Sequence, residues 1–446
     1  MNRKAFVVGL DGATFDIIIP LVKNGKLPTF SYIMKNGTWG RLKSTIPPVS
    51  APAWVSFATG VNPGKHGIFD FKKWDREEYC KSEIVSSYDV RAPRIWEILE
   101  LYGKKCGVVN LPLTYPPQRI DGFMISGMLT PPSSENFTYP PELKEELEDY
   151  KIDIEFGKYG FIPSFGLLKK SKMYRELISI ERIRLKNVLK LMKREWDLFI
   201  VVFRHLDSAQ HVFWGDKKLI EGVYREADHI LASILERLEN TNVFVVSDHG
   251  FEEKANKDFH LNDWLIKNGY MKLKPEFRKP FINKRTLNVL KKLKILDIIW
   301  SVLPKKESFV YEYKHVDWTK TKAYFSPKHF AFPWIGVEIN VKGVKKNGIV
   351  SSKEYEKLRE EIIERVSKVT DPQTGECIVE GVFKREDIYK GEFVEDAPDI
   401  IIKFKFPYRG EKSVGNRSLI SPSLKTNIKG EHELYGIFLA IGPDIE

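Results

Sequence analysis

Seven residues of this 446-residue chain have side chains that bind divalent metals or act as nucleophiles, and each ends or follows a short apolar run. They are Asp11, Ser50, Asp207, His211, Asp248, His249 and His432. Carboxylates and imidazoles together suit zinc and similar divalent ions. Two such ions side by side can activate a nucleophile and hold the leaving oxygen of a phosphate ester. The residue types therefore predict a two-metal site.

Three of the carboxylates stand where predicted buried strands end. Asp11, Asp207 and Asp248 follow runs rich in Val, Ile, Leu and Phe, at 5–10, 198–203 and 243–247. Such runs are typical of parallel strands covered on both faces. A helix predicted over 167–196 precedes the second run, and one over 217–238 follows it, which indicates an α/β fold with a doubly wound, mostly parallel sheet. Functional residues of such sheets lie at the carboxyl ends of the strands, so the seven side chains are expected to converge.

Six motifs, in their order along the chain, resemble the alkaline phosphatase superfamily, and within it the branch of type I phosphodiesterases and nucleotide pyrophosphatases with their prokaryotic relatives. The motifs lie at 9–12, 47–54, 58–68, 206–211, 247–251 and 430–432. The resemblance extends from residue 5 to about residue 443. It implies an alkaline phosphatase-like core, a metal-dependent phosphoric ester hydrolase, and two bound divalent ions, zinc or alternatively manganese.

The resemblance also implies how the metal ligands divide into two sets. The first set consists of Asp11, Asp248 and His249, together with Ser50. The second set consists of Asp207, His211 and His432. Each ion would then have three protein ligands and one open or shared position, which is the pattern of a catalytic rather than a structural site.

Ser50 matches the nucleophile position of the resembled family, because Pro52, Thr59 and Gly60 follow it at the family's spacing. Metal coordination is one way to activate a serine that is otherwise a poor nucleophile. The alternative is that Ser50 caps the following helix, since Ser is favoured at that position, and both roles are compatible. Ser44 and Thr45 lie upstream and are alternative candidates for the nucleophile, but they are less well placed than Ser50. We expect a phosphoseryl intermediate on Ser50.

The substrate is narrowed by two departures from related families. Trp54 replaces the Arg of sulfatases, which argues against a sulfatase. Ala53 replaces an Asn of nucleotide pyrophosphatases, which weakens the case for a nucleotide substrate but not for the metal chemistry. A phosphodiester is favoured, with a phosphomonoesterase, phosphomutase or phosphotransferase as alternatives. A non-catalytic binding protein that keeps the fold is the alternative of another class. The candidate substrate contacts are Trp54, Asn110, Tyr115, Arg204 and His260.

The later half of the chain contains a segment that we predict to be an insertion into the catalytic domain. Residues 267–325 are basic and aromatic and lack the strand–helix alternation, so they are expected to form an inserted cap. Residues 1–266 and 326–446 would form the catalytic domain. Strands are predicted over 329–342 and 397–404, and a helix over 351–366 opens with the capping signal of Ser351 and Glu354.

Composition limits which binding partners and which cellular location are expected for this protein. The chain has 42% hydrophobic residues, a formal charge of +11 and three scattered cysteines, so a folded protein without a disulfide framework is expected. No run reaches bilayer-spanning length, and the interpretation is a cytoplasmic, soluble protein. High charge with few Cys and Met hints at a thermophilic source. We expect a small phosphoester substrate and no obligate nucleic acid, and the oligomeric state is left open.

Overall fold

The computed structural model describes residues 3–152, 170–276, 313–328, 333–416, 418–423 and 428–445. Three predictions fall partly outside these ranges. They are the first residues of the helix over 167–196, most of the cap over 267–325, and the start of the strand over 329–342.

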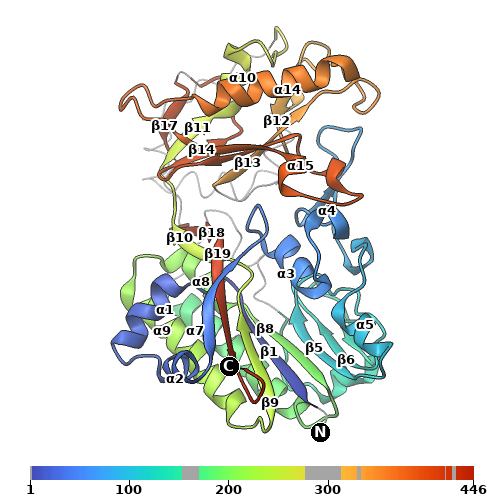
Figure 1. Ribbon diagram of the computed structural model, residues 1–446, viewed down its shortest axis with the longest axis vertical. Helices are drawn as coiled ribbons and strands as arrows, with labels where there is room; N and C mark the ends of the chain where they lie inside the picture. Colours follow the sequence, from blue (N-terminus) through green and yellow to red (C-terminus); the bar gives the residue numbers. More distant parts are fainter. Residues whose placement is uncertain are drawn as a thin grey trace.

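The main sheet has eight strands in the order β2-β19-β9-β1-β8-β5-β6-β7 (Figure 1). Their bounds are β1 Lys4–Leu10, β2 Thr38–Lys43, β5 Cys106–Leu111, β6 Gly122–Ser126, β7 Thr138–Tyr139, β8 Leu198–Phe203, β9 Thr241–Val246 and β19 Tyr435–Ile441. The five central strands β9, β1, β8, β5 and β6 run parallel, whereas β19 and β7 are antiparallel to their neighbours. The mostly parallel sheet predicted from the apolar runs is therefore confirmed.

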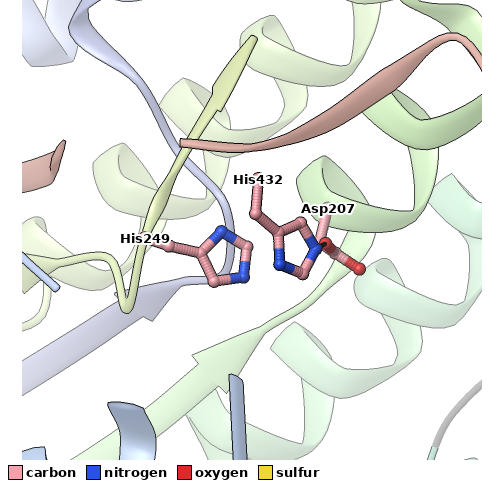
Figure 2. A group of neighbouring side chains, drawn as sticks. All are labelled: Asp207, His249 and His432. Carbon is pink, nitrogen blue, oxygen red and sulfur yellow. Dashed lines mark ion pairs between the residues drawn. The ribbon is translucent and has the colours of Figure 1, made fainter. Parts of the chain in front are cut away.

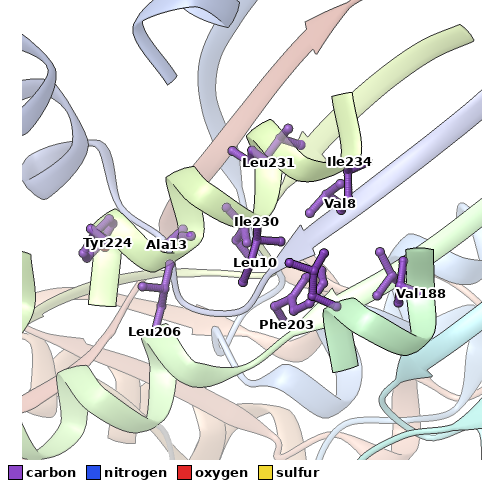
Figure 3. Packing of buried hydrophobic residues seen from close by; sticks show 14 of the residues in the cluster. Val8, Leu10, Ala13, Val188, Phe203, Leu206, Tyr224, Ile230, Leu231 and Ile234 are labelled. Carbon is purple, nitrogen blue, oxygen red and sulfur yellow. The ribbon is translucent and has the colours of Figure 1, made fainter. Parts of the chain in front are cut away.

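Helices cover both faces of this sheet. They are α1 Phe15–Lys23, α2 Pro28–Asn36, α3 Ser50–Thr59, α4 Pro63–His66, α5 Ile95–Glu100, α7 Lys170–Leu191, α8 His205–Phe213 and α9 Lys217–Leu235. Alternate residues of β8 divide between two cores, because successive side chains of a strand point to opposite faces. Phe199 and Phe203 pack with α7, α8 and α9, whereas Ile200 and Val202 pack with Trp54 of α3 and Trp96 of α5. The sheet is thus doubly wound, and Figure 3 shows the first of these cores.

Phe199 is the centre of an aromatic group in the first core. It is fully buried, and its ring stacks on Phe6 at 4.8 Å and meets Phe123 at 5.5 Å. Phe199→Ala is expected to lower the free energy of unfolding by about 3–5 kcal/mol, because a large cavity would replace the ring. Urea denaturation measures this loss. Leu101→Ala, at a side chain that is 84% exposed, is the control, and equal losses for both variants would contradict the packing.

A second sheet lies above the first in Figure 1, with strand order β12-β13-β15-β14. Its elements are β12 Ala323–Phe325, β13 Trp334–Ile339, β14 Val379–Lys384 and β15 Ile400–Phe404, with α10 Leu261–Lys267, α14 Ser352–Ser367 and α15 Arg385–Ile388. The predicted capping signal is present, since Ser351 and Glu354 form a capping box at the start of α14. The strands predicted over 329–342 and 397–404 pair with each other here. The domain boundaries stay a prediction.

Smaller pairings join the two parts and complete the fold. They are β3 Lys72–Trp74 with β4 Ser82–Ile84, β10 Gly250–Glu253 with β18 Gly430–Glu433, and β11 Lys257–His260 between β16 Tyr408–Glu411 and β17 Ile420–Pro422. The chain leaves the first sheet through β10 and returns to it through β18 and β19. Within the described ranges, no helix is both long enough and apolar enough to cross a bilayer.

Candidate metal centre

The seven candidate residues come together at the carboxyl edge of the parallel strands. Asp11 follows β1, and the Asp248–His249 pair follows β9 after one residue. Asp207 and His211 lie on α8, which begins two residues after β8, and their spacing of four places both on one face of the helix. Ser50 is the first residue of α3, and His432 lies in β18.

Gly12 makes the tight turn that brings Asp11 next to the other ligands. Its φ is +72°, a conformation that favours glycine, and a Cβ there would stand 3.2 Å from the Cα of Asp207. Its backbone N–H donates to Oδ1 of Asp248 at 3.1 Å. The turn therefore needs glycine both for its backbone angle and for the close approach of α8.

The second predicted set is compact. Nε2 of His211 lies 3.3 Å from Oδ1 of Asp207, and Nε2 of His432 lies 3.2 Å from the same oxygen. The two Nε2 atoms are 3.1 Å apart. Four ligands held tetrahedrally at about 2.0 Å from zinc are separated by about 3.3 Å. The three atoms are therefore spaced as zinc ligands would be.

The first predicted set adjoins it through His249. Nε2 of His249 lies 3.2 Å from Oδ2 of Asp248, 3.7 Å from Oδ1 of Asp11 and 3.3 Å from Oγ of Ser50. Its ring also stacks on that of His432, with centroids 3.7 Å apart. Figure 2 shows His249 beside His432 and Asp207. The two sets thus form one continuous cluster, and His249 could serve either group.

Backbone carbonyls orient all three imidazoles. Nδ1 of His211 lies 3.1 Å from the carbonyl oxygen of Gly430, Nδ1 of His249 lies 3.0 Å from that of Gly250, and Nδ1 of His432 lies 2.9 Å from that of Pro48. A carbonyl only accepts, so each Nδ1 carries the proton and donates it. Each Nε2 is then left as an acceptor that faces the cluster, as in histidines that bind metals.

The carboxylates share a similar asymmetry. Asp11, Asp207 and Asp248 are buried, and each has one carboxylate oxygen that forms no hydrogen bond with the described residues. Burial, and then repulsion from Asp207, raises the pKa of Asp11 to about 6. Burial and the charges of Asp11 and Asp207 likewise raise the pKa of Asp248 well above its usual range. A buried cluster of like charges with open oxygens suits divalent cations, which would offset the repulsion.

Ser50 is buried at the start of α3, with its Oγ directed at the cluster. The residue in the capping position is Val49, and Ser50 follows it as the first helical residue. The upstream rival Thr45 instead donates its hydroxyl to the carbonyl of Pro47 at 3.0 Å. The helix N-terminus beside Ser50 presents backbone N–H groups, a setting that favours a bound anion.

Two of the candidate substrate contacts lie against the metal ligands. The indole N–H of Trp54 donates to Oδ2 of Asp11 at 3.2 Å. Nε of Arg204 donates to the same oxygen at 3.1 Å, and its Nη2 lies 3.6 Å from Oδ2 of Asp207. Both side chains are almost fully buried. Their role toward the substrate stays a prediction.

The other three candidates lie in different surroundings. Asn110 is buried with φ of 59° and donates from Nδ2 to the carbonyl of Val202 at 2.8 Å. The phenol oxygen of Tyr115 accepts from Ser134 at 3.1 Å. His260 lies within the β16-β11-β17 sheet, where its ring nitrogens lie 3.1 and 3.0 Å from two serine hydroxyls. Their contact with substrate also stays a prediction.

Glu181 of α7 was missed from the sequence. Its Oε1 accepts from the backbone N–H groups of Arg204 at 2.8 Å and His205 at 3.1 Å, at the start of α8. A glutamate in a charged amphipathic helix is typical of a solvated face. Glu181 differs from an ordinary surface glutamate of such a helix in its burial, since it is only 3% exposed. No local sequence pattern indicates that burial.

Buried carboxylates, imidazoles and a serine at the carboxyl edge of a doubly wound α/β sheet are the arrangement expected of a metal-dependent phosphoester hydrolase. The chain belongs to the type I phosphodiesterase / nucleotide pyrophosphatase family, whose sequence model matches residues 5–409. The expected superfamily and enzyme class are thereby confirmed. No curated protein matches the chain significantly.

Solved structures share this fold at low sequence identity. Phosphonoacetate hydrolase from Sinorhizobium meliloti, in complex with phosphonoacetate, is similar with a TM-score of 0.59 and 14% identity, over 100% of this chain and 92% of the hydrolase. Murine ectonucleotide pyrophosphatase / phosphodiesterase 5 is similar with a TM-score of 0.53 and 16% identity, over 99% of this chain and 88% of the murine protein. These similarities confirm the alkaline phosphatase-like fold.

Proposed function

We propose that this protein cleaves phosphodiesters at a two-metal site, with Ser50 as the nucleophile. The observation that carries the proposal is the convergence of three imidazole Nε2 atoms and three unpaired carboxylate oxygens beside the Ser50 hydroxyl. Asp11, Asp248 and His249 would hold one ion, with Ser50. Asp207, His211 and His432 would hold the other. The spacing of the second set supports zinc, with manganese as the alternative.

Bound metal ions would supply Lewis acidity for the phosphoryl oxygens and lower the pKa of the Ser50 hydroxyl. The Ser50 Oγ then attacks phosphorus in line with the leaving alkoxide. The hydroxyl proton is released to solvent, and the alkoxide takes up a proton from solvent. A phosphoseryl ester and a free alcohol result. Water then attacks phosphorus from the side that the alkoxide vacated, opposite Oγ of Ser50, which releases the phosphate monoester and returns a proton to Ser50. Two inversions give net retention at phosphorus.

A diester is favoured over a monoester by the surroundings of Ser50. A monoester dianion calls for an additional cation aimed at the transferring phosphoryl group. Arg204 carries such a charge, but its guanidinium lies against Asp11 and Asp207. The lining of a cavity of about 500 Å³ includes Asp248 and Trp54, the apolar side chains of Ile46, Phe57 and Val61, and Lys43. This mainly apolar space suits the second substituent of a diester.

A bis-aryl phosphodiester is therefore expected to be cleaved with a higher kcat/KM than the matching aryl monoester. The physical reason is the apolar space beside Trp54 and the engagement of Arg204 with carboxylates. Steady-state kinetics on both chromogenic substrates, with added zinc or manganese, measure the ratio. A clear preference for the monoester would shift the assignment to a phosphomonoesterase, phosphomutase or phosphotransferase.

We further propose that residues 267–325 form the cap that selects the substrate.

A further inference from the structure

Arg204 contacts both ligand sets at once. Its guanidinium, in a side chain that is 3% exposed, donates from Nε to Oδ2 of Asp11 at 3.1 Å. Its Nη2 lies 3.6 Å from Oδ2 of Asp207. Asp11 belongs to one ligand set and Asp207 to the other. A single side chain therefore lies against the outer oxygens of two carboxylates that would bind different ions.

Arg204 contacts the carboxylate oxygens that face away from the other candidate ligands. On Asp11 and on Asp207, Oδ2 is the oxygen toward Arg204, and Oδ1 has no hydrogen bond with any of the described residues. Trp54 adds a second N–H donor to Oδ2 of Asp11 at 3.2 Å. A guanidinium has a rigid, planar array of donors, so it can hold two carboxylates at a set angle to each other, which a flexible ammonium cannot.

Arg204 is itself held in place from the rear. The backbone N–H groups of Arg204 and His205 donate to Oε1 of Glu181, at 2.8 and 3.1 Å. No side chain of α8 caps its own N-terminus, so the carboxylate of Glu181 in α7 satisfies this helix end. Arg184, which is 1% exposed, forms an ion pair with Glu181. The start of α8 is thereby fixed, and with it Asp207 and His211.

We infer that Arg204 is a positioning residue that sets Asp11 and Asp207 at a fixed angle, and that Glu181 positions Arg204 through the start of α8. The inference rests on the proposed two-metal function. It differs from a substrate contact, because Arg204 then acts on metal affinity before any substrate binds. It also differs from charge neutralisation alone, because removing a cation beside a metal site would tighten metal binding rather than weaken it.

The test measures zinc affinity by competition with a chromogenic chelator, in wild type, Arg204→Met, Arg204→Lys and Arg365→Met. Arg204→Met is expected to weaken binding of both ions about 10–100-fold, the usual cost of losing a group that orients metal ligands. Arg204→Lys is expected to be intermediate, since it keeps the charge without the planar donors. Arg365→Met is the matched control, because Arg365 pairs with Glu361 on α14, beside the second sheet. Circular dichroism and thermal melting verify folding.

Glu181→Gln keeps the size of the side chain and removes its charge, so it tests the second half of the inference. It is expected to weaken the ion held by Asp207 and His211 more than the other, because α8 carries both residues. His432→Ala leaves the set with Asp11, Asp248 and His249 intact. In that background, Glu181→Gln should therefore lower zinc affinity less than it lowers the affinity of the Asp207 and His211 set in otherwise wild-type protein. Equal effects on both ions would overturn the assigned route through α8.

Three other results would also overturn the inference. Unchanged zinc affinity in Arg204→Met with a raised KM would make Arg204 a substrate contact. Tighter zinc binding in Arg204→Met would mean that Arg204 only neutralises charge. Full zinc affinity in Arg204→Lys would mean that the planar guanidinium is not needed to hold Asp11 and Asp207 at a fixed angle. Wild-type protein that binds no zinc or manganese would instead refute the proposed function. If Arg204→Met fails to fold, Arg204→Lys and Glu181→Gln still decide the inference.

Discussion

Ser50→Ala is expected to lower the turnover of a phosphodiester about a million-fold, the loss seen when a serine protease loses its nucleophile. Oγ of Ser50 lies 3.3 Å from Nε2 of His249, and the remaining ligands in both sets come from other residues. The variant should therefore keep its fold and both ions while losing the group that forms the covalent ester. Initial rates with saturating diester, together with elemental analysis of the same preparation, measure the two effects separately.

Ser233→Ala is the control, because Ser233 lies in α9 outside the cluster and its replacement should leave the rate unchanged. Acid quenching of wild type during turnover of a diester, followed by mass analysis, should show a phosphoryl group that still carries the retained substituent on the peptide that contains Ser50. A Ser50→Ala rate near that of wild type would mean that water attacks phosphorus directly.

His432→Ala is expected to reduce the metal content from two ions to one. His432 contributes to the set with Asp207 and His211, and the other set keeps all of its ligands. The rate should fall by about a thousandfold or more, because the Lewis-acid contribution of one ion amounts to several kcal/mol. Elemental analysis after dialysis gives the ion count, and steady-state kinetics give the rate.

His229→Ala provides the matched histidine control, since His229 is exposed on α9. Treating the wild-type protein with a chelator should remove both ions and the activity, and adding zinc or manganese should restore them. Two ions retained in His432→Ala would show that the Asp207 and His211 pair binds without it. The stacking of His249 on His432 then makes His249 the replacement ligand to examine.

Local patterns predicted several elements close to where the structure has them. The helix predicted over 217–238 is α9, Lys217–Leu235, and the capping signal at Ser351 and Glu354 opens α14. These predictions held because hydrophobic periodicity and caps depend on residues near one another in the chain. The pairing of β13 with β15 in a separate second sheet was not predicted. It joins residues 334–337 to 400–403, and no short-range pattern specifies that partner.

The sequence by itself predicted the edge of the sheet at which the candidate site lies, and its resemblance to a known superfamily pointed to the seven candidate residues. Three carboxylates follow buried parallel strands, and the carboxyl ends of such strands share one edge of a sheet, so the residues had to meet. Only the tertiary structure decided how they meet. The orientation of Asp11 depends on Trp54 and Arg204, and that of α8 on Glu181, which come from distant parts of the chain. Side-chain orientation follows from the groups packed around it, and these are assembled only when the sheet and its helices come together.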